Sequence, residues 1–431
     1  MISIFWFRRD LRLEDNTALS AALSRNTHVL PIFIFDENVI DELPANDARI
    51  SFIYETLKTI NSKLTAKGKS LLCLKGDPIK VWKQLITDHD IDSVYINKDY
   101  EPYAIQRDND IEKFLRENNI DLFRYKDQVI FEENEILKND GSPYTVYTPY
   151  KNKWLHYFKP NFQLQSPKLS NLYSSSFSFP NYEDLRITKS KIEVQPFSID
   201  ASNDYAHTRD YPSLNSTSYL GPHLRFGTVS IRQVINSLTT EDPTFLSELI
   251  WREFFMQILH HFPHVVHHNF KPKYDGISWR NNESEFDKWC NGKTGYPLVD
   301  AGMRQLNKTG YMHNRVRMIA AGFLCKHLLI DWRWGEAYFA TKLLDYELSS
   351  NNGNWQWAAG TGCDAAPYFR VFNPSTQLKK FDRDLIYVKQ WIPELLTLDY
   401  PLPMVDHKLA RNRALESYKV GIGKRKIAIK Y

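Results

Sequence analysis

Short apolar runs alternate with helical patterns over the first 130 residues or so of the chain. Four runs, at residues 2–7, 29–35, 70–76 and 91–97, have the length and the Ile, Val, Leu and Phe content of buried strands. Between them, residues 17–24 and 48–68 follow the spacing of a helix face. Strands that alternate with helices predict a Rossmann-like parallel sheet with helices on both faces.

No G-x-G-x-x-G sequence follows the first apolar run, so the dinucleotide-binding fingerprint is absent. In a parallel sheet, a ligand binds outside the carboxyl ends of the strands. The polar residues at those ends are 8–10, which read RRD, and 97–102, which read NKDYEP. A ligand of this first region is therefore expected beside these two segments.

The pattern changes twice more along the chain. Residues 131–200 are rich in Ser, Pro, Asn and Tyr and show little periodicity, which predicts a connector that lies over the surface. After them, residues 245–262, 297–310 and 314–329 carry apolar positions three and four apart, with Gly or Pro at several ends. The prediction is an α/β domain at 1–130, a connector at 131–200 and an all-helical domain at 201–431.

Composition narrows the classes of protein that fit this pattern. The chain of 431 residues is too long for one hydrophobic core. Its 11 Trp, 24 Tyr and 25 Phe are a high aromatic content for a soluble protein. Large cores and Tyr-rich surfaces explain these aromatic residues as well as a binding site does. A net charge of +4 permits a polyanionic partner without requiring one.

Cysteine usage and hydropathy favour the cytoplasm. The four cysteines are scattered without the spacing of metal ligands, so we expect reduced thiols and no metal. The N-terminus lacks the order of a signal peptide, and no apolar stretch reaches the roughly 20 residues of a membrane span. A soluble cytoplasmic protein without membrane contact is expected.

Residues 314–318, which read NRVRM, carry an unusual helical face. Asn314, Arg317 and Met318 are three and four positions apart, with Arg315 to the side. An amide, a guanidinium and a thioether make a poor core stripe, which favours a binding face. A partly solvated helix explains the same residues if its inward positions are Ile319, Ala320 and Phe323.

Two further segments admit both a chemical and a structural interpretation. Thr217 and Ser218 precede a predicted helix, where unpaired N–H groups favour a phosphate, although such hydroxyl residues are also common N-caps. Glu248, Trp251 and Arg252 share helical spacing and are able to form a polar pocket with a stacking wall. An exposed ion pair between Glu248 and Arg252 is the alternative.

Residues 351–360 read NNGNWQWAAG and hold two indoles two positions apart. On a helix, Trp355 and Trp357 diverge by roughly 200°, so they face different surroundings. The residues around them are small or carry amides, which is unusual for a core. The segment therefore predicts two separate aromatic environments.

Several long motifs resemble the photolyase/cryptochrome flavoproteins, and most closely the class I cyclobutane pyrimidine dimer photolyases. In chain order they read FWFRRDLRLEDN, TSYLGPHLRFG, ELIWREFF, NRVRM, LLIDWRWGEAYF and NNGNWQWAAGTGCDAAPYFRVFNP, within residues 3–395. The resemblance implies an α/β antenna domain, an all-helical FAD domain and a monomer that repairs UV-damaged DNA with light. A cryptochrome-like photoreceptor and a (6-4) photoproduct photolyase are the alternatives.

The resemblance also implies the residues that contact FAD. Arg317 and Asp345 match a charge pair beside the flavin, and Asn351 matches the residue at flavin N5. Because Asn351 is an amide, it cannot exchange a proton there as a carboxylate could, which favours repair over signalling. The other positions matched to FAD contacts are Tyr205, Thr217, Ser218, Tyr219, Leu220, Gly221, Arg252, Asn314, Tyr346 and Glu347.

The two indoles of residues 351–360 receive different roles from the resemblance. Trp355 matches the indole nearest the flavin, followed outward by Trp332 and Trp279 in an electron relay. Trp357 matches a wall of the lesion pocket, opposite Trp251. The carboxylate matched to the lesion carbonyl is Glu248, and the other positions matched to lesion or DNA contacts are Arg209, Asn314, Arg315 and Met318.

The chain departs from the family pattern at three places. Gly221 stands where many relatives have Ser, and Glu347 where Asp is more usual, and neither change removes a charge that the chemistry needs. Tyr103 and Ala104 occupy the positions of an Asn-Glu pair in folate-binding relatives. A methenyltetrahydrofolate antenna is therefore disfavoured, and a deazaflavin, another flavin or no antenna remain as alternatives.

Overall fold

The computed structural model describes residues 1–200, 204–238 and 243–428, with side chains up to residue 423. Two compact units interleave along the chain. The sheet unit comprises Met1–Glu135, Tyr157–Ile199 and Tyr219–Thr239. The helical unit comprises Ile136–His156, Asp200–Ser218 and Thr240–Tyr431. This division differs from the predicted domain boundaries at residues 130 and 200. The sheet unit also contains segments that follow residue 130, and the helical unit also contains a segment that precedes residue 200.

Five parallel strands form the sheet of the sheet unit, in the order β3-β2-β1-β4-β5. Their bounds are β1 Ile2–Phe7, β2 Val29–Asp36, β3 Leu72–Gly76, β4 Ile91–Asn97 and β5 Asp121–Tyr125. The parallel α/β prediction is confirmed. The fifth strand was not predicted, because β5 is short and two of its five residues, Asp121 and Arg124, are charged.

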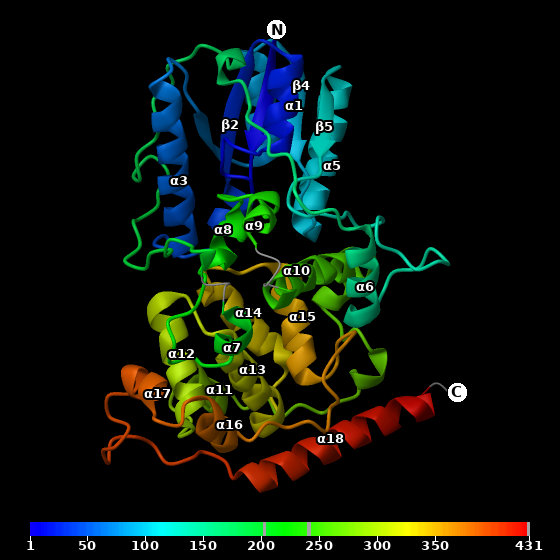
Figure 1. The fold of residues 1–431 in the computed structure, drawn as a ribbon, viewed down its shortest axis with the longest axis vertical. Helices are drawn as coiled ribbons and strands as arrows, with labels where there is room; N and C mark the ends of the chain where they lie inside the picture. The colour runs from blue at the N-terminus through cyan, green and yellow to red at the C-terminus, as the bar shows by residue number, and fades with distance from the viewer. Residues whose placement is uncertain (201–203, 239–242, 429–431) are drawn as a thin grey trace. The chain divides into compact units, whose positions relative to one another are not determined.

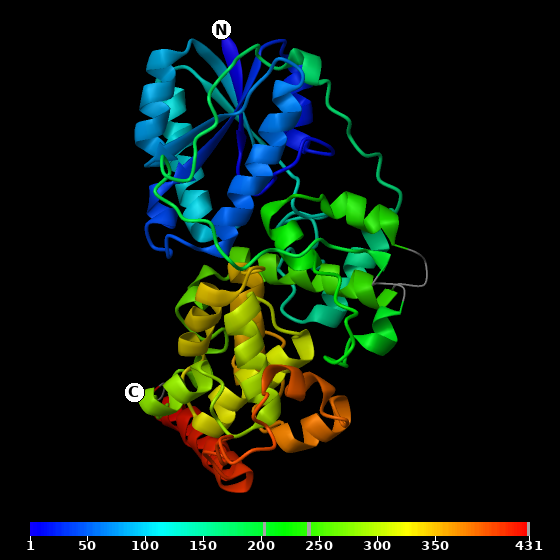
Figure 2. The ribbon, with the colours of Figure 1, turned by 90° about the vertical axis from the view of Figure 1, so that its left-hand side faces the viewer.

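Helices cover both faces of this sheet (Figures 1 and 2). Phe5 and Phe7 of β1 pack in one cluster with α1 (Thr17–Arg25) and α3 (Ala48–Thr65). Ile4 and Trp6 pack in the other with α4 (Pro78–Asp88) and α5 (Pro102–Glu117). Burial on both faces explains why every residue of β1 except the buried Ser3 is apolar. The remaining helices of the unit are α2 Glu37–Ile40, η1 Leu169–Asn171, α8 Leu220–Phe226 and α9 Ile231–Ser237.

The described helices of the helical unit include those predicted at 245–262, 297–310 and 314–329, together with α6 from the segment predicted to be a connector. They are α6 Tyr147–Tyr157, α7 Tyr205–Thr208, α10 Pro243–His261, η3 Pro263–Val266, η4 Pro272–Tyr274, α11 Glu283–Cys290, α12 Pro297–Thr309, α13 Asn314–Gly322, η5 Phe323–Leu328, α14 Trp332–Lys342, α15 Leu348–Ala359, α16 Pro374–Phe381, α17 Ile386–Trp391 and α18 His407–Ala428. The single helix expected at 314–329 is divided, because η5 takes π-helical geometry.

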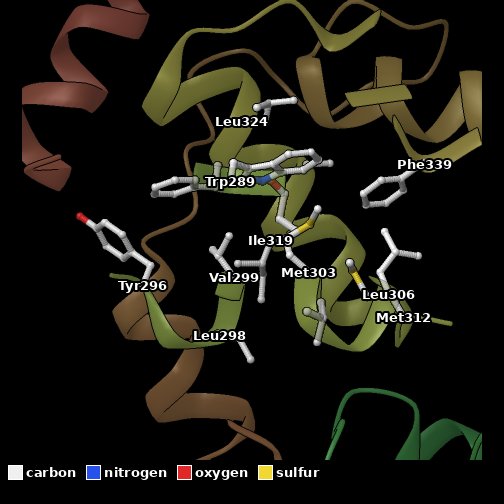
Figure 3. Close-up of a cluster of buried hydrophobic side chains, with 14 of the residues drawn as sticks. Trp289, Tyr296, Leu298, Val299, Met303, Leu306, Met312, Ile319, Leu324 and Phe339 are labelled. Carbon is white, nitrogen blue, oxygen red and sulfur yellow. The ribbon is translucent and has the colours of Figure 1, made fainter. Parts of the chain in front are cut away.

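The core of the helical unit is aromatic and aliphatic (Figure 3). Trp289 of α11 is fully buried and packs in the same cluster as Met303 of α12 and Phe339 of α14. A Cβ on Gly302 would lie 2.3 Å from Val316 Cγ1, so this glycine lets α12 and α13 approach closely. The candidate residues on α13, α14 and α15 are therefore held by a tightly packed scaffold.

The segment predicted to be a surface connector contains a buried helix, α6, so this part of the prediction is wrong. Tyr150 and Trp154 of α6 are 0% and 1% exposed, and with Tyr147 they form one aromatic face at helical spacing. This face packs within the helical unit. A helical domain that began at residue 201 would therefore lack one of its own buried helices. The signal that could have revealed it was the spacing of three aromatic residues rather than composition.

No helix in the described ranges is both long and apolar enough to cross a membrane. Within those same ranges, no group of three or more His, Cys, Asp or Glu side chains is arranged to hold a metal. The four cysteines are free thiols.

Candidate functional site

Both indoles of residues 351–360 lie on α15. Trp355 is 2% exposed, whereas Trp357 is half-buried. Two positions on a helix point in directions roughly 200° apart, so one indole enters the core and the other does not. The expected pair of separate environments is confirmed.

The Trp355 indole packs directly against α14. Its ring centroid lies 5.0 Å from that of Phe339 and 6.1 Å from that of Trp289. A Cβ on Gly335 would lie 2.1 Å from Trp355 Cη2, so only glycine leaves space for the indole. The indole is thereby fixed in a dry, aromatic environment.

The other two indoles of the expected relay differ in exposure. Trp332 is 0% exposed, and its Nε1–H donates to Asn269 Oδ1 at 2.9 Å. Trp279 is half-buried, and its ring lies 5.8 Å from that of Tyr418. Exposure increases from Trp355 and Trp332 to Trp279, which is the order that an inward relay needs. The relay itself stays a prediction.

Asn351 lies one turn before Trp355 on α15 and is 8% exposed. Its Nδ2 donates to the carbonyl oxygen of Glu336 at 3.1 Å and to Glu336 Oε1 at 2.8 Å. Because both hydrogens are used, the amide presents Oδ1 as its acceptor. Burial raises the pKa of Glu336, and its hydrogen bond to Asn351 opposes this. Sequence reasoning had missed Glu336.

Two ion pairs connect the predicted FAD contacts. Arg317 Nη2 lies 2.9 Å from one oxygen of Asp345 and 3.2 Å from the other, which confirms the charge pair expected from the resemblance. Arg252 Nη2 lies 3.2 Å from Glu347 Oε1, and Glu347 is 5% exposed. Glu347 is the N-cap residue of α15, so this pair joins α10 to the helix that carries Asn351.

The expected alternative of a Glu248–Arg252 pair is wrong, because each residue has another partner. Glu248 Oε1 accepts from Arg209 Nη1 at 2.7 Å. Arg209 also lies over the Tyr205 ring at 5.0 Å. Burial raises the pKa of Tyr205 to about 12, and the charge of Glu248 adds to this effect. Arg209, Tyr205 and Glu248 therefore form one polar cluster beside Trp251.

The NRVRM face of α13 combines both interpretations of its sequence. The buried side consists of Ile319, Ala320 and Phe323, which are at most 2% exposed. On the other side, Asn314 is exposed, and Arg317 and Met318 are half-buried. Arg315 Nη2 donates to Asp210 Oδ1 at 2.5 Å. A packed inner face thus supports an accessible polar outer face.

His313 is the N-cap residue of α13, and its Nδ1 accepts from the backbone N–H of Arg315 at 3.2 Å. Burial and the neighbouring charge of Arg317 lower the pKa of His313 to about 4. The imidazole is therefore neutral at pH 7 and adds no charge to this face.

The predicted phosphate segment, residues 217–221, crosses from the helical unit to the sheet unit after Ser218. The N-cap residue of α8 is Tyr219, with a left-handed φ of 53° and no side-chain cap. Neither Thr217 nor Ser218 is therefore a plain N-cap. Leu220 is buried and begins α8, and Gly221 is exposed.

Sequence reasoning also missed Tyr147 of α6. Its ring stacks on Trp251 with 3.6 Å between the ring centroids and 8° between the planes. Trp251 lies on α10, one turn before Phe255, whose ring is 5.4 Å away. One face of the Trp251 indole is thus covered by Tyr147.

In the sheet unit, the carboxyl ends of β1, β2 and β4 carry a charged and aromatic cluster. Tyr103 is 43% exposed, and its hydroxyl donates to Asp36 at 2.6 Å. Burial and this hydrogen bond raise the pKa of Tyr103 to about 12. The Arg107 guanidinium lies 5.1 Å from the Trp6 ring and 5.8 Å from the Tyr103 ring. Ala104 is buried.

Two family models match this chain. The model of the DNA photolyase domain matches residues 3–168, and that of the FAD-binding domain of DNA photolyase matches residues 245–399. Most of the candidate residues of the helical unit lie within the second range. A parallel sheet joined to a helical FAD-binding unit is thus the class of protein that this fold defines.

Relatives match over nearly the whole chain. A deoxyribodipyrimidine photo-lyase of Escherichia coli is 36% identical over 96% of this chain and 98% of its own. A class III photolyase structure from Agrobacterium tumefaciens has a TM-score of 0.88 at 35% identity and covers 97% of each chain. A photolyase structure from Sulfolobus tokodaii, described as holding two FAD molecules, has a TM-score of 0.86 at 37% identity over 97% of this chain and 100% of its own. The chain belongs to the DNA photolyase family and is a photo-lyase enzyme.

The residues of the helical unit fit an FAD. Asn351 presents Oδ1 as an acceptor because its Nδ2 donates to Glu336, and this oxygen suits an N–H donor such as that of a reduced flavin. Ser349, in the first turn of α15, has a buried hydroxyl without a hydrogen-bond partner. Orphaned polar groups in a buried position indicate a missing ligand or water. Arg317 and Arg252 supply positive charge on the elements next to these groups.

Proposed function

We propose that this chain repairs cyclobutane pyrimidine dimers in UV-damaged DNA with light. The observation that carries the proposal is α15, which presents an amide, a buried indole and a half-buried indole along one helix. Reduced FAD, when bound and excited by light, supplies the electron that splits the dimer. The chain's own residues hold the flavin, shield it and receive the damaged bases.

The flavin contacts would come from the charged and amide groups of α13, α15 and their flanks. Asn351 would accept a hydrogen bond at flavin N5, while Glu336 holds the amide in that orientation. Arg317, fixed by Asp345 and by the Met312 carbonyl oxygen at 2.7 Å, would supply positive charge beside the ring. Thr217 and Ser218, which end the Asp200–Ser218 segment of the helical unit, would contact the phosphates through their hydroxyl groups.

The lesion would be received between aromatic and polar groups. Trp251 and Trp357 would contact the flipped bases, and stacking of this kind contributes roughly 1–3 kcal/mol per base. Glu248, oriented by Arg209, would hydrogen-bond the lesion carbonyl and stabilise charge as it develops. A damaged dinucleotide leaves the base stack at lower cost than an intact one, which adds selectivity.

Photoreduction would use the buried indoles as an electron path. Trp279, the most exposed of the three, would pass electrons inward through the buried Trp332 and Trp355. The rigid packing of Trp355 on Gly335 supports this role, because a fixed indole keeps a fixed distance to its partner.

The sheet unit would bind a second, light-harvesting chromophore, and a flavin fits its residues better than a folate. Tyr103 offers an exposed ring with Arg107 beside it, and the Asn-Glu pair of folate-binding relatives is absent. The Sulfolobus tokodaii photolyase, which is described with two FAD molecules and a novel light-harvesting cofactor, supports this choice. Chromatography of the cofactors released on denaturation would give two flavins per chain, against one if the antenna is absent.

Four unpaired thiols support a reducing compartment such as the cytoplasm as the place of action. A monomer remains the expected state in solution, and light scattering would test it.

An absorption spectrum of the purified protein, followed by an illuminated repair assay, tests cofactor and reaction together. A bound flavin and light-dependent loss of thymine dimers from an oligonucleotide are expected. Repair of (6-4) photoproducts instead of thymine dimers would show that the enzyme acts on (6-4) photoproducts. Flavin photoreduction without repair of either lesion would indicate a photoreceptor.

A further inference from the structure

The strongest unassigned feature of the helical unit is the contact between Tyr147 and Trp251. The two rings are nearly parallel, with 8° between their planes and 3.6 Å between their centroids. Contact at this distance between parallel rings fixes the plane of each ring relative to the other. Tyr147 comes from α6, outside the range that matches the FAD-binding family model.

The hydroxyl group of Tyr147 fixes the ring at a second point. It donates to the carbonyl oxygen of Ser247 at 2.6 Å and lies 2.6 Å from the Ser247 Oγ. Ser247 lies one helical turn before Trp251 on α10. The ring and the hydroxyl of Tyr147 therefore hold the same face of the same helix.

The backbone of Tyr147 reaches toward the other proposed lesion wall. Its N–H donates to Asp364 Oδ2 at 2.9 Å. Asp364 belongs to the segment that follows α15, the helix of Trp357. A carboxylate at a helix N-terminus is favourable because the first N–H groups of the helix have no intrahelical partner. Tyr147 thus links the helix of Trp251 to the segment after Trp357.

The rest of α6 keeps Tyr147 in place. Tyr150 is 0% exposed, and the Trp154 Nε1–H donates to Glu253 Oε1 at 2.7 Å. Glu253 is a buried residue of α10, two positions after Trp251. Helix α6 is therefore attached to α10 along its length, so the stacked ring cannot move without the helix.

We infer that Tyr147 is a positioning residue for lesion binding, which holds the Trp251 indole in the plane that the dimer contacts. This inference rests on the proposed repair function. Holding the indole before binding removes the loss of its rotational freedom from the binding free energy. The Tyr147 ring also covers one face of the indole, so bases reach only its remaining surface. Tyr147 therefore acts on the affinity for the lesion rather than on electron transfer.

The test compares Tyr147→Leu, which removes the stack, with Tyr147→Phe, which keeps the stack and loses the hydroxyl. Both holoenzymes are titrated with a duplex that carries one thymine dimer and with the undamaged duplex, and repair is followed under saturating light. For Tyr147→Leu, the Kd and KM for the dimer rise by about 2- to 13-fold. The kcat and the affinity for undamaged DNA stay unchanged, and Tyr147→Phe keeps most of the lesion affinity.

Tyr182→Leu is the matched control, because it removes a tyrosine packed on Tyr54 in the sheet unit at 4.0 Å. Its lesion affinity equals that of the wild type, and the flavin content of every variant confirms folding. Wild-type lesion affinity in Tyr147→Leu, or an equal loss with undamaged DNA, overturns the inference alone. A wild type that does not distinguish damaged from undamaged DNA overturns the proposed function instead.

Discussion

Two aromatic regions of the helical unit meet on α15 and differ in how they are built. The proposed relay region, Trp279, Trp332 and Trp355, has two buried indoles that are fixed by a glycine contact and a hydrogen bond. The proposed wall region, Glu248, Trp251 and Trp357, is half-buried and contacts Arg209 and Tyr147. Electron transfer needs fixed distances in a dry core, whereas lesion binding needs accessible surface. One helix would serve both proposed roles because its sides have different surroundings.

The largest effect is expected from Trp355→Phe. Loss of the innermost relay indole should nearly abolish photoreduction of oxidised FAD, because phenylalanine is much harder to oxidise. Repair by chemically pre-reduced enzyme should persist, since that reaction does not use the relay. Flash photolysis and a repair assay measure the two activities.

Trp289→Phe is the control for that experiment. Trp289 is fully buried and its ring lies 6.1 Å from that of Trp355, but it has no assigned role in the relay. Photoreduction at the wild-type rate is expected. A loss as large as that of Trp355→Phe would move the electron path from α14 to α11.

The next largest effect is expected from Trp357→Ala, which removes a wall and leaves the relay intact. The Kd for dimer-containing DNA should rise roughly 5- to 150-fold, corresponding to about 1–3 kcal/mol of lost stacking. Photoreduction should be unchanged. Trp334→Ala, which removes another half-buried indole, provides the control in the same binding titration. Unaltered lesion affinity in Trp357→Ala would show that Trp357 does not form a wall of the lesion pocket.

A smaller effect is expected from Arg209→Leu. If Arg209 also contacts a phosphate, affinity for undamaged DNA should fall several-fold, and the slope of log K against log salt should decrease by about 0.9. Binding titrations at several salt concentrations measure both quantities. A loss confined to damaged DNA would mean that Arg209 acts only by orienting Glu248.

The smallest effect concerns the pH dependence of stability in Glu336→Gln. Burial raises the pKa of Glu336 above its ordinary value of 4.5, so the folded state holds this proton more tightly than the unfolded state. Stability contributed by the protonated group is lost as pH rises from 4.5 through the folded pKa. The variant should therefore gain stability relative to the wild type between pH 4.5 and 7.5, measured by urea unfolding. An equal difference at both pH values would mean that Glu336 has no raised pKa.

The sequence predicted the features that depend on local periodicity or on long motifs. Hydrophobic runs gave four of five strands, and the motif resemblance gave the Arg317–Asp345 pair before any geometry was available. Helical spacing also separated the surroundings of Trp355 from those of Trp357.

Other features depend on contacts between distant parts of the chain. Helical proximity suggested a Glu248–Arg252 pair, yet the partners are Arg209, which follows α7, and Glu347, which precedes α15. The aromatic face of α6 was hidden in a segment whose composition resembled a connector, so Tyr147 and its stack on Trp251 were missed. A local pattern lists possible partners, and tertiary packing chooses among them.

Gly335 has a consequence for anyone who alters this enzyme. A single methyl group at that position would overlap the Trp355 ring. Helices α14 and α15 are therefore packed too closely to accommodate one additional carbon atom. Replacing glycine with alanine there would act as a wedge that displaces the proposed electron donor, Trp355, while every aromatic side chain of the proposed relay is still present.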